Sequence, residues 1–400
     1  MRGAGPLVAA LSVAATLLAL EGIVRLRVSP ANRAALPHVG VGAETQRRLE
    51  WVEQGRATRG AEAWQLDIPD PVLGWRPKPG IVAHSVRSGS YDVTVTTNAQ
   101  GLRGGRPTAR ATRPDTTRVA VFGCSQNFGS GVEDDETFSA RVEASLRDVE
   151  VLNFGVHGYG TDQMLLRWER EGVDYTPDVV VLAFAYYHLD RNVTGFRFFA
   201  KPYFALAADG GVRLEGVPVP DPDVLARDGS LRAPWPVADQ SVLLRWLWDR
   251  ELRRRQAALY QAEGPAWDVT RALIARFADT AHRHGARMIL LNIDEDAPWL
   301  SAPLAQLAAE HGIAFADAGP ALGPPRGRGV RLRLPDDPHW NPQGHAIIAG
   351  VLRGALCAQG DVAGCADGSA EGAAHEPEDP ETRHGGGPDL EQGGAPRARQ

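Results

Sequence analysis

Hydrophobic and polar residues follow one another along residues 118–319 in a pattern that predicts alternating strands and helices. Short apolar runs typical of buried strands occupy residues 118–123, 149–155, 177–185, 286–294 and 313–319. Apolar side chains at helical spacing occupy the segments between them, at residues 137–148, 161–172, 267–285 and 304–312. Near-continuous apolar strands separated by helices are typical of a parallel sheet covered on both faces. The pattern therefore predicts an α/β fold, with its chemistry at the carboxyl ends of the strands.

Segments with other patterns flank and interrupt this α/β region. A hairpin signal at Asp209, Gly210 and Gly211 is followed by an Arg-rich amphipathic helix within residues 241–260. We interpret this helix as a solvated cover helix rather than as a membrane or ligand contact. The predicted divisions are an anchor at 1–28, a helical connector and small β-rich segment at 29–117, an α/β domain at 118–358 with an insertion at 195–262, and a disordered tail at 359–400.

The N-terminus carries a targeting signal. Arg2 precedes an apolar run from Pro6 to Leu20, which approaches the length of a membrane span if Ile23 and Val24 join it. The run is also longer than most signal-peptide cores. We therefore expect an uncleaved signal anchor, with the rest of the chain extracytoplasmic. A cleaved signal, which would make the protein secreted, is the alternative.

Composition excludes several other classes. The 400 residues carry a formal net charge of −6 and contain no basic cluster with interleaved aromatic residues, so nucleic acid is not an expected partner. Three cysteines are too few for a disulfide framework, and none forms the C-x-x-C pair typical of zinc sites. A globular protein without a cofactor is the expectation.

The stretch "GCSQNFG" follows the first predicted strand and contains two candidate nucleophiles, Cys124 and Ser125. A strand that leads directly into a loop can expose a side chain and leave backbone N–H groups free to bind an anion. The stretch is not the G-x-S-x-G elbow, because Asn127 occupies the position of the second glycine. Taken alone, it fits a structural turn equally well.

A second candidate segment, "LPDDPHWNPQGH", precedes an apolar helix near the C-terminus. A carboxylate two or three residues before His339 can fix the imidazole tautomer while the histidine takes a proton from a nucleophile. Both Asp336 and Asp337 have this spacing. Together with His345 these residues are also possible metal ligands, but no second ligand-rich segment has zinc spacing, so no metal is expected.

A third segment, "NFGVHGYG", follows the second predicted strand. Its glycines permit close approach of the backbone to a ligand, and a backbone N–H there could help to hold an oxyanion. A plain strand-to-helix turn is the alternative interpretation.

These three segments together resemble the SGNH/GDSL hydrolase family, over about residues 118–356. The first family block, Gly-Asp-Ser, matches Gly123 and Ser125, with Cys124 in place of its aspartate. The second block, Asn-x-x-x-x-Gly, matches Asn153 and Gly158, and the last block matches "DDPHWN". The resemblance implies a flavodoxin-like three-layer α/β/α fold. It also implies Ser125 as nucleophile, Gly158 as an oxyanion donor, and an Asp–His pair at the C-terminal end.

Two details of the resemblance bear on the site. Family members similar to alginate O-acetyltransferases have Asp-x-His-Trp, and this favours Asp337 over Asp336 as the partner of His339. The third family block, Gly-x-Asn-Asp, has no match after the third strand, where "AYYHLDRN" stands instead. Tyr187 or Asn192 could supply the missing oxyanion donor.

The resemblance implies a serine esterase or an O-acyltransferase. Because an envelope anchor is also expected, we expect an acyl ester as substrate, with a cell-envelope carbohydrate as its acceptor by analogy. A non-catalytic envelope protein that uses the same pocket to bind carbohydrate is the alternative, motivated by the altered third block.

Overall fold

The structure is a computed structural model that describes residues 4–54, 65–208, 210–221, 224, 234–360, 362 and 365. Contacts divide the chain into one large unit, Met1–Gly364, and the C-terminal segment Cys365–Gln400. Beyond Cys365, the predicted disordered tail lies outside the described residues.

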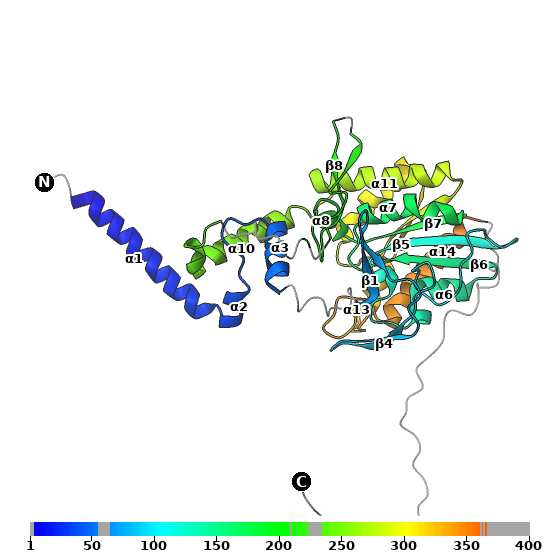
Figure 1. Cartoon of the computed structure of the whole chain (residues 1–400), viewed down its shortest axis with the longest axis horizontal. Helices are drawn as coiled ribbons and strands as arrows, with labels where there is room; N and C mark the ends of the chain where they lie inside the picture. Colours follow the sequence, from blue (N-terminus) through cyan, green and yellow to red (C-terminus); the bar gives the residue numbers. More distant parts are fainter. Residues whose placement is uncertain are drawn as a thin grey trace, which may run out of the picture. The chain divides into compact units, whose positions relative to one another are not determined.

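A five-stranded parallel sheet forms the core of the α/β region (Figure 1). Its strands are β5 (Thr117–Gly123), β6 (Val149–Gly155), β7 (Val179–Phe184), β10 (Arg287–Asn292) and β11 (Ala314–Asp317). They lie in the order β11-β10-β7-β5-β6, and every neighbouring pair is parallel. This is the flavodoxin-like order, in which the chain reverses direction across the sheet next to the first strand. The predicted α/β fold is therefore confirmed.

Helices cover both faces of this sheet (Figure 1). On one face α7 (Thr161–Arg170), α11 (Pro265–Arg283) and α12 (Ser301–Glu310) share one apolar core with the strands. On the other face α6 (Phe138–Ser145) packs against α14 (Pro342–Ala358), which also contacts α13 (Gly319–Gly327). Because both faces are covered, the side chains of β6 and β7 are buried along their whole length.

Short antiparallel hairpins precede the sheet. β1 (Asp67–Asp70) pairs with β2 (Gly74–Pro77), and β3 (His84–Arg87) pairs with β4 (Asp92–Val95). Two helices, α2 (Pro30–Ala34) and α3 (Ala43–Gln54), connect them to the N-terminal helix.

The chain between β7 and α11 contains α8 (His188–Asn192), the hairpin of β8 (Tyr203–Leu206) and β9 (Val212–Glu215), and α10 (Val242–Ala257). The start of α10 is bound to α1 (Ala4–Arg27), where Glu21 accepts hydrogen bonds from the backbone N–H groups of Val242 and Leu243 at 3.0 and 2.9 Å. Residues Pro6–Arg27 of α1 form a helix that is long and apolar enough to cross a membrane.

Candidate active site

A cavity of about 730 Å³ lies at the carboxyl ends of the parallel strands. Ser125 follows β5, His157 and Gly158 follow β6, Ala185 follows β7, and Asp294 follows β10, and all of them line it. Helix α3, the loop after α8 and the C-terminal loop at residues 338–340 complete the wall. The strand ends of an open parallel sheet are the usual place for a ligand site.

Ser125 is the first residue of α5 (Ser125–Phe128), a single helical turn directly after β5. Cys124 is the N-cap of this turn and is 0% exposed. Its Sγ lies 3.3 Å from the Oη of Tyr187, and Cys124 does not line the cavity. Of the two candidate nucleophiles, the structure thus brings Ser125 to the cavity and buries Cys124.

Three polar side chains form a hydrogen-bonded chain at the cavity. The Oγ of Ser125 lies 2.8 Å from the Nε2 of His339, and the Nδ1 of His339 lies 2.6 Å from the Oδ1 of Asp337. The same carboxylate accepts the backbone N–H of His339 at 2.8 Å. The hydrogen bond from His339 lowers the pKa of Asp337 below its ordinary value. With Nδ1–H donating to Asp337, Nε2 is free to accept the Ser125 hydroxyl proton.

The structure distinguishes the two neighbouring aspartates. Asp336 is exposed and adopts a positive φ of 53°, whereas Asp337 is bonded to His339. The left-handed backbone at Asp336 turns the chain, so that the carboxylate of Asp336 lies in solvent and that of Asp337 lies next to His339. Only Asp337 is placed to orient the imidazole.

Gln126 connects the two segments that supply Ser125 and His339. Its Nε2 donates to the carbonyl of Pro338 at 3.2 Å, and its Oε1 accepts the backbone N–H of Trp340 at 3.0 Å. The amide therefore holds the residues on both sides of His339, and it is 4% exposed. Sequence reasoning missed Gln126, for which the only signal was its position directly after Ser125.

We expect Gln126→Leu to lower kcat for ester hydrolysis by about tenfold to a hundredfold with a smaller change in KM, because a small displacement of His339 misaligns proton transfer. Steady-state kinetics check this. Gln306→Leu, which removes an exposed glutamine bonded to Glu310, is the control and should leave kcat unchanged. Equal kcat values for the two variants would contradict a positioning role for Gln126.

The third predicted segment, "NFGVHGYG", begins in β6 and packs against the α5 turn. The Nδ2 of Asn153 donates to the carbonyl of Asn127 in α5 at 2.7 Å. At Gly155 a Cβ atom would lie 2.2 Å from the backbone nitrogen of Phe128, so only glycine permits this approach. Gly158 has a φ of 71° and lines the cavity.

The two other predicted oxyanion donors have different positions. Tyr187 lines the cavity, with its Oη next to Cys124. Asn192 is 0% exposed and does not line the cavity. Its Nδ2 donates to Thr270 at 2.9 Å, and its Oδ1 accepts the backbone N–H of Asp162 at 3.3 Å. The structure thus brings Tyr187, but not Asn192, to the cavity.

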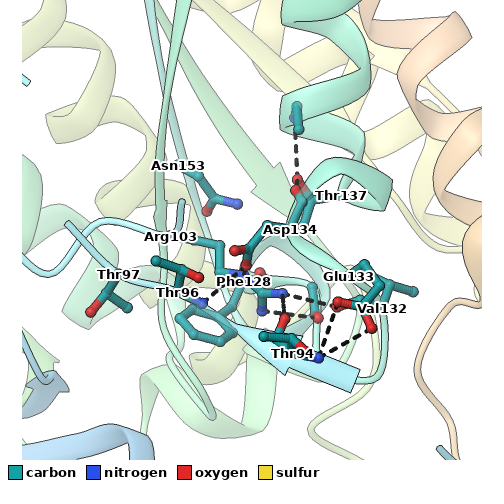
Figure 2. Close-up of polar contacts among 12 residues, drawn as sticks. Thr94, Thr96, Thr97, Arg103, Phe128, Val132, Glu133, Asp134, Thr137 and Asn153 are labelled. Carbon is teal, nitrogen blue, oxygen red and sulfur yellow. Dashed lines mark hydrogen bonds and ion pairs between the residues drawn. The ribbon is translucent and has the colours of Figure 1, made fainter. Parts of the chain in front are cut away.

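Arg103, which precedes β5 in the chain, binds residues at the end of the α5 turn (Figure 2). Its guanidinium donates to the carboxylate of Asp134 at 2.6 Å and to the carbonyl of Val132 at 2.9 Å. Longer hydrogen bonds of 3.4 and 3.3 Å reach the carbonyls of Phe128 and Gly129, where α5 ends. The side chain is 1% exposed, so these acceptors replace the water that a buried cation loses.

Residues of the β1–β2 hairpin bind the third segment in the same way. Asp67 of β1 lies 2.9 Å from the Nδ1 of His157, and the indole N–H of Trp75 donates to the His157 carbonyl at 2.7 Å. The Oη of Tyr159 donates to the Trp75 carbonyl. The β1–β2 hairpin therefore packs directly against the loop after β6, which lines the cavity.

His345, considered above as a metal ligand, lies in the core next to α6. Its Nδ1 accepts the backbone N–H of Phe138 at 3.2 Å, and its ring stacks on that of Phe138. Burial lowers the pKa of His345 to about 3. Within the described part of the chain, no three His, Cys, Asp or Glu side chains are grouped so that they could hold a metal ion.

This buried histidine predicts a pH dependence of stability. The pKa of His345 is about 3 in the folded state, and its ordinary value is 6.5. The contribution of neutral His345 to the free energy of unfolding is therefore fully present above pH 6.5 and is lost as the pH falls toward 3. Within that pH window, the free energy of unfolding is expected to change by about 1.4 kcal/mol per pH unit because of this residue. Urea unfolding of the detergent-solubilised chain should show a slope shallower by this amount in His345→Gln. An unchanged slope would contradict the assignment.

The other cavity residues missed by sequence reasoning come from the connector and the insertion. Trp51 of α3 lines the cavity, as do Gln256 at the end of α10 and Tyr260 just after it. The interpretation of residues 241–260 as only a solvated cover helix was therefore incomplete. No periodicity in the sequence signals these contacts, because more than 70 residues separate Trp51 from Ser125.

Comparison with known proteins gives one family match. The sequence model of the GDSL-like Lipase/Acylhydrolase family matches residues 120–347. No curated protein matches the chain. Among solved structures, the chain is similar to a member of the lipolytic protein G-D-S-L family from Veillonella parvula, with 15% identity, a TM-score of 0.32, and coverage of 60% of this chain and 99% of that chain. A catalytic mutant of an acetylxylan esterase from Geobacillus stearothermophilus is 13% identical, with a TM-score of 0.35 and coverage of 61% and 96%.

Proposed function

The chain belongs to the GDSL-like lipase/acylhydrolase family and is a serine ester hydrolase, and we propose that Ser125 is its nucleophile and an acylated carbohydrate its substrate. One observation carries the assignment of the nucleophile: the hydrogen-bonded chain from Asp337 through His339 to Ser125 at the wall of the cavity. Family membership favours ester hydrolysis over the alternative of a non-catalytic carbohydrate-binding protein.

The proposed reaction is acyl transfer in two steps. The Oγ of Ser125 attacks the ester carbonyl while the Nε2 of His339 takes its proton, and Asp337 stabilises the imidazolium that forms. His339 then gives this proton to the departing alkoxide. In the second step His339 removes a proton from water, or from an acceptor hydroxyl, which attacks the acyl-enzyme. His339 then returns this proton to the Oγ of Ser125 as the bond between that oxygen and the acyl group breaks.

Two backbone groups are available for the oxyanion. The N–H groups of Ser125 and Gly158 make no hydrogen bond within the described residues, and both residues line the cavity. Preorganised donors of this kind stabilise the charge that develops in the transition state. Tyr187 is the proposed side-chain donor that compensates for the altered third block.

The cavity lining supports a carbohydrate as the substrate. Aromatic side chains that can stack on the apolar faces of sugar rings gather around it: Trp51, Tyr186, Tyr187, Phe196, Phe198, Phe199, Tyr260 and Trp340. Gln256, whose amide side chain can bind hydroxyl groups, lies among them. Mixed aromatic and polar walls of this type fix the orientation of a small polar ligand.

We also propose that α1 anchors the protein in a membrane and that the hydrolase domain, residues 118–358, lies on the extracytoplasmic side. The exposed apolar side chains of α1 support the anchor. Because Glu21 of α1 binds the start of α10 and Gln256 at the end of α10 lines the cavity, the anchor would hold the cavity near the membrane surface.

An ester assay tests the proposed function. We expect the detergent-solubilised chain to release p-nitrophenolate from p-nitrophenyl acetate, and His339→Ala to lose this activity. Addition of an oligosaccharide then separates hydrolysis from transfer, because only transfer gives an acetylated oligosaccharide by mass spectrometry. Release at the same rate by the His339→Ala variant would contradict the proposed mechanism.

A further inference from the structure

Three arginines line one part of the cavity: Arg47 of α3, Arg191 of α8, and Arg197 in the loop that follows α8. We call them the arginine cluster. In each of the three, the Nε atom is buried and has no hydrogen-bond partner within the described residues. Three guanidinium groups that line one cavity, none of them saturated with partners among the described residues, are suited to bind an acidic ligand group.

Arg197 is the least engaged member of the cluster. Its guanidinium makes no side-chain hydrogen bond or ion pair within the described part of the chain, and it lies 5.5 Å from the ring centroid of Phe198. Burial, and then the charge of Arg191, lower the pKa of Arg197 to about 10. A buried cation without a partner is costly, so an anion bound here would relieve that cost.

Arg191 is held rigidly and places the cluster close to the nucleophile. It is 7% exposed, its Nη1 donates to the Tyr159 carbonyl at 2.9 Å, and its own carbonyl accepts from the Nζ of Lys201 at 2.9 Å. Its guanidinium lies 4.3 Å from the ring centroid of Tyr187. Because the Oη of Tyr187 contacts the residue before Ser125, the cluster adjoins the proposed reaction centre.

Carboxylates near the cluster do not neutralise it. Asp190 lies 4.0 Å from Arg47, and Glu50 accepts a hydrogen bond from Gln46 at 2.7 Å. Of these two carboxylates, only Glu50 lines the cavity together with the three guanidinium groups.

The two other acids of the cavity lie at the C-terminal side of the site. Asp296 is paired with Arg333 at 2.7 Å, and Asp294 accepts the backbone N–H of Tyr186 at 3.3 Å. Burial raises the pKa of Asp294 above its ordinary value. The cluster thus keeps a positive excess on the face that it shares with Ser125.

We propose that the arginine cluster binds an anionic group, a carboxylate or a phosphate, on the same substrate whose ester Ser125 attacks. Guanidinium groups bind both anions through paired N–H donors, which suits two or three arginines around one ligand group. The inference rests on the proposed function and deepens it, because it makes the substrate an acidic carbohydrate ester.

Matched esters test the proposal. We expect kcat/KM for the monoacetates of a methyl glucuronoside and of a methyl glucoside phosphate to exceed that of the neutral methyl glucoside monoacetate. Arg197→Gln should lower this anionic-to-neutral ratio by about tenfold to a hundredfold, mainly through KM. Arg197→Lys should retain part of it. Arg250→Gln, at an exposed arginine of α10, is the control and should leave the ratio unchanged.

The outcomes separate this inference from the proposed function. A higher kcat/KM for the glucuronoside ester identifies a carboxylate as the bound group, and a higher value for the phosphate ester identifies a phosphate. If all three esters are hydrolysed equally and Ser125→Ala abolishes hydrolysis, the function stands and the arginine proposal is overturned. An unchanged ratio in Arg197→Gln overturns it as well.

A binding measurement keeps the test independent of turnover. Calorimetry on the Ser125→Ala protein should show tighter binding of the unacetylated glucuronoside or glucoside phosphate than of the neutral glucoside. The added Arg197→Gln change should remove this difference. Equal affinities for all three sugars would overturn the arginine proposal even if no ester proved to be a substrate.

Discussion

Asp337→Asn is expected to lower kcat for ester hydrolysis by about 10⁴-fold, as removal of the carboxylate does in other Asp–His–Ser sites. The carboxylate of Asp337 accepts both the backbone N–H and the ring N–H of His339. An asparagine amide in its place can reverse the tautomer, so that Nε2 carries the proton and cannot accept the one from Ser125. Substrate binding should change much less, because Asp337 does not line the cavity.

The neighbouring aspartate provides the matched control. Asp336→Asn changes the same functional group one residue away, at an exposed position that does not contact His339. Its kcat should stay within about threefold of the unmodified protein, the usual scale of surface substitutions. Loss of activity in Asp336→Asn with retention in Asp337→Asn would reverse the assignment of the acid.

Lys201→Met is expected to lower the free energy of unfolding by about 3–5 kcal/mol, because it leaves a carboxylate buried without its counter-ion. The Nζ of Lys201 donates to the carboxylate of Asp162, and both side chains are 0% exposed. The same ammonium group donates to the carbonyls of Arg191, Thr194 and Pro202 at 2.9, 3.0 and 2.8 Å. It therefore joins the start of α7 to α8 and the loop after it, which carry two of the three arginines of the cluster.

Two comparisons show whether the buried pair causes this loss. Lys78→Met alters the chain's only other lysine, whose hydrogen bond to Gln65 is exposed, and should cost less than about 1 kcal/mol. In the double variant Lys201→Met/Asp162→Asn no buried charge is left unpaired, so part of the stability should return. Urea unfolding followed by tryptophan fluorescence measures all three. Equal stability of Lys201→Met and Lys78→Met would contradict the predicted cost.

Much of the fold could be predicted because buried parallel strands are apolar on both faces. The run at residues 149–155 becomes β6, with all seven residues buried, and the run at 177–185 contains β7. The strand order followed only from the family resemblance, since periodicity does not reveal which strands are neighbours. The hydrogen bonds between hairpin residues and the loops of the site could not be predicted from the sequence, because they depend on how distant segments pack together.

The residues of the site could be predicted where they belong to short sequence motifs. Ser125 and the Asp337–His339 pair lie in motifs whose spacing has a chemical reason, and the structure brings them together. Asn192 was considered because of its residue type, but its amide is used by Thr270 inside the core. The role of a side chain such as Arg197 depends on which partners it lacks, and only coordinates reveal that.

Covalent labelling of Ser125 tests the central claim most directly. After reaction with a fluorophosphonate, peptide mass spectrometry should place the label on Ser125 in the unmodified protein and in Cys124→Ser. No label should be found in Ser125→Ala. A label that persists in Ser125→Ala but disappears in Cys124→Ser would identify Cys124 as the nucleophile and contradict the proposed mechanism.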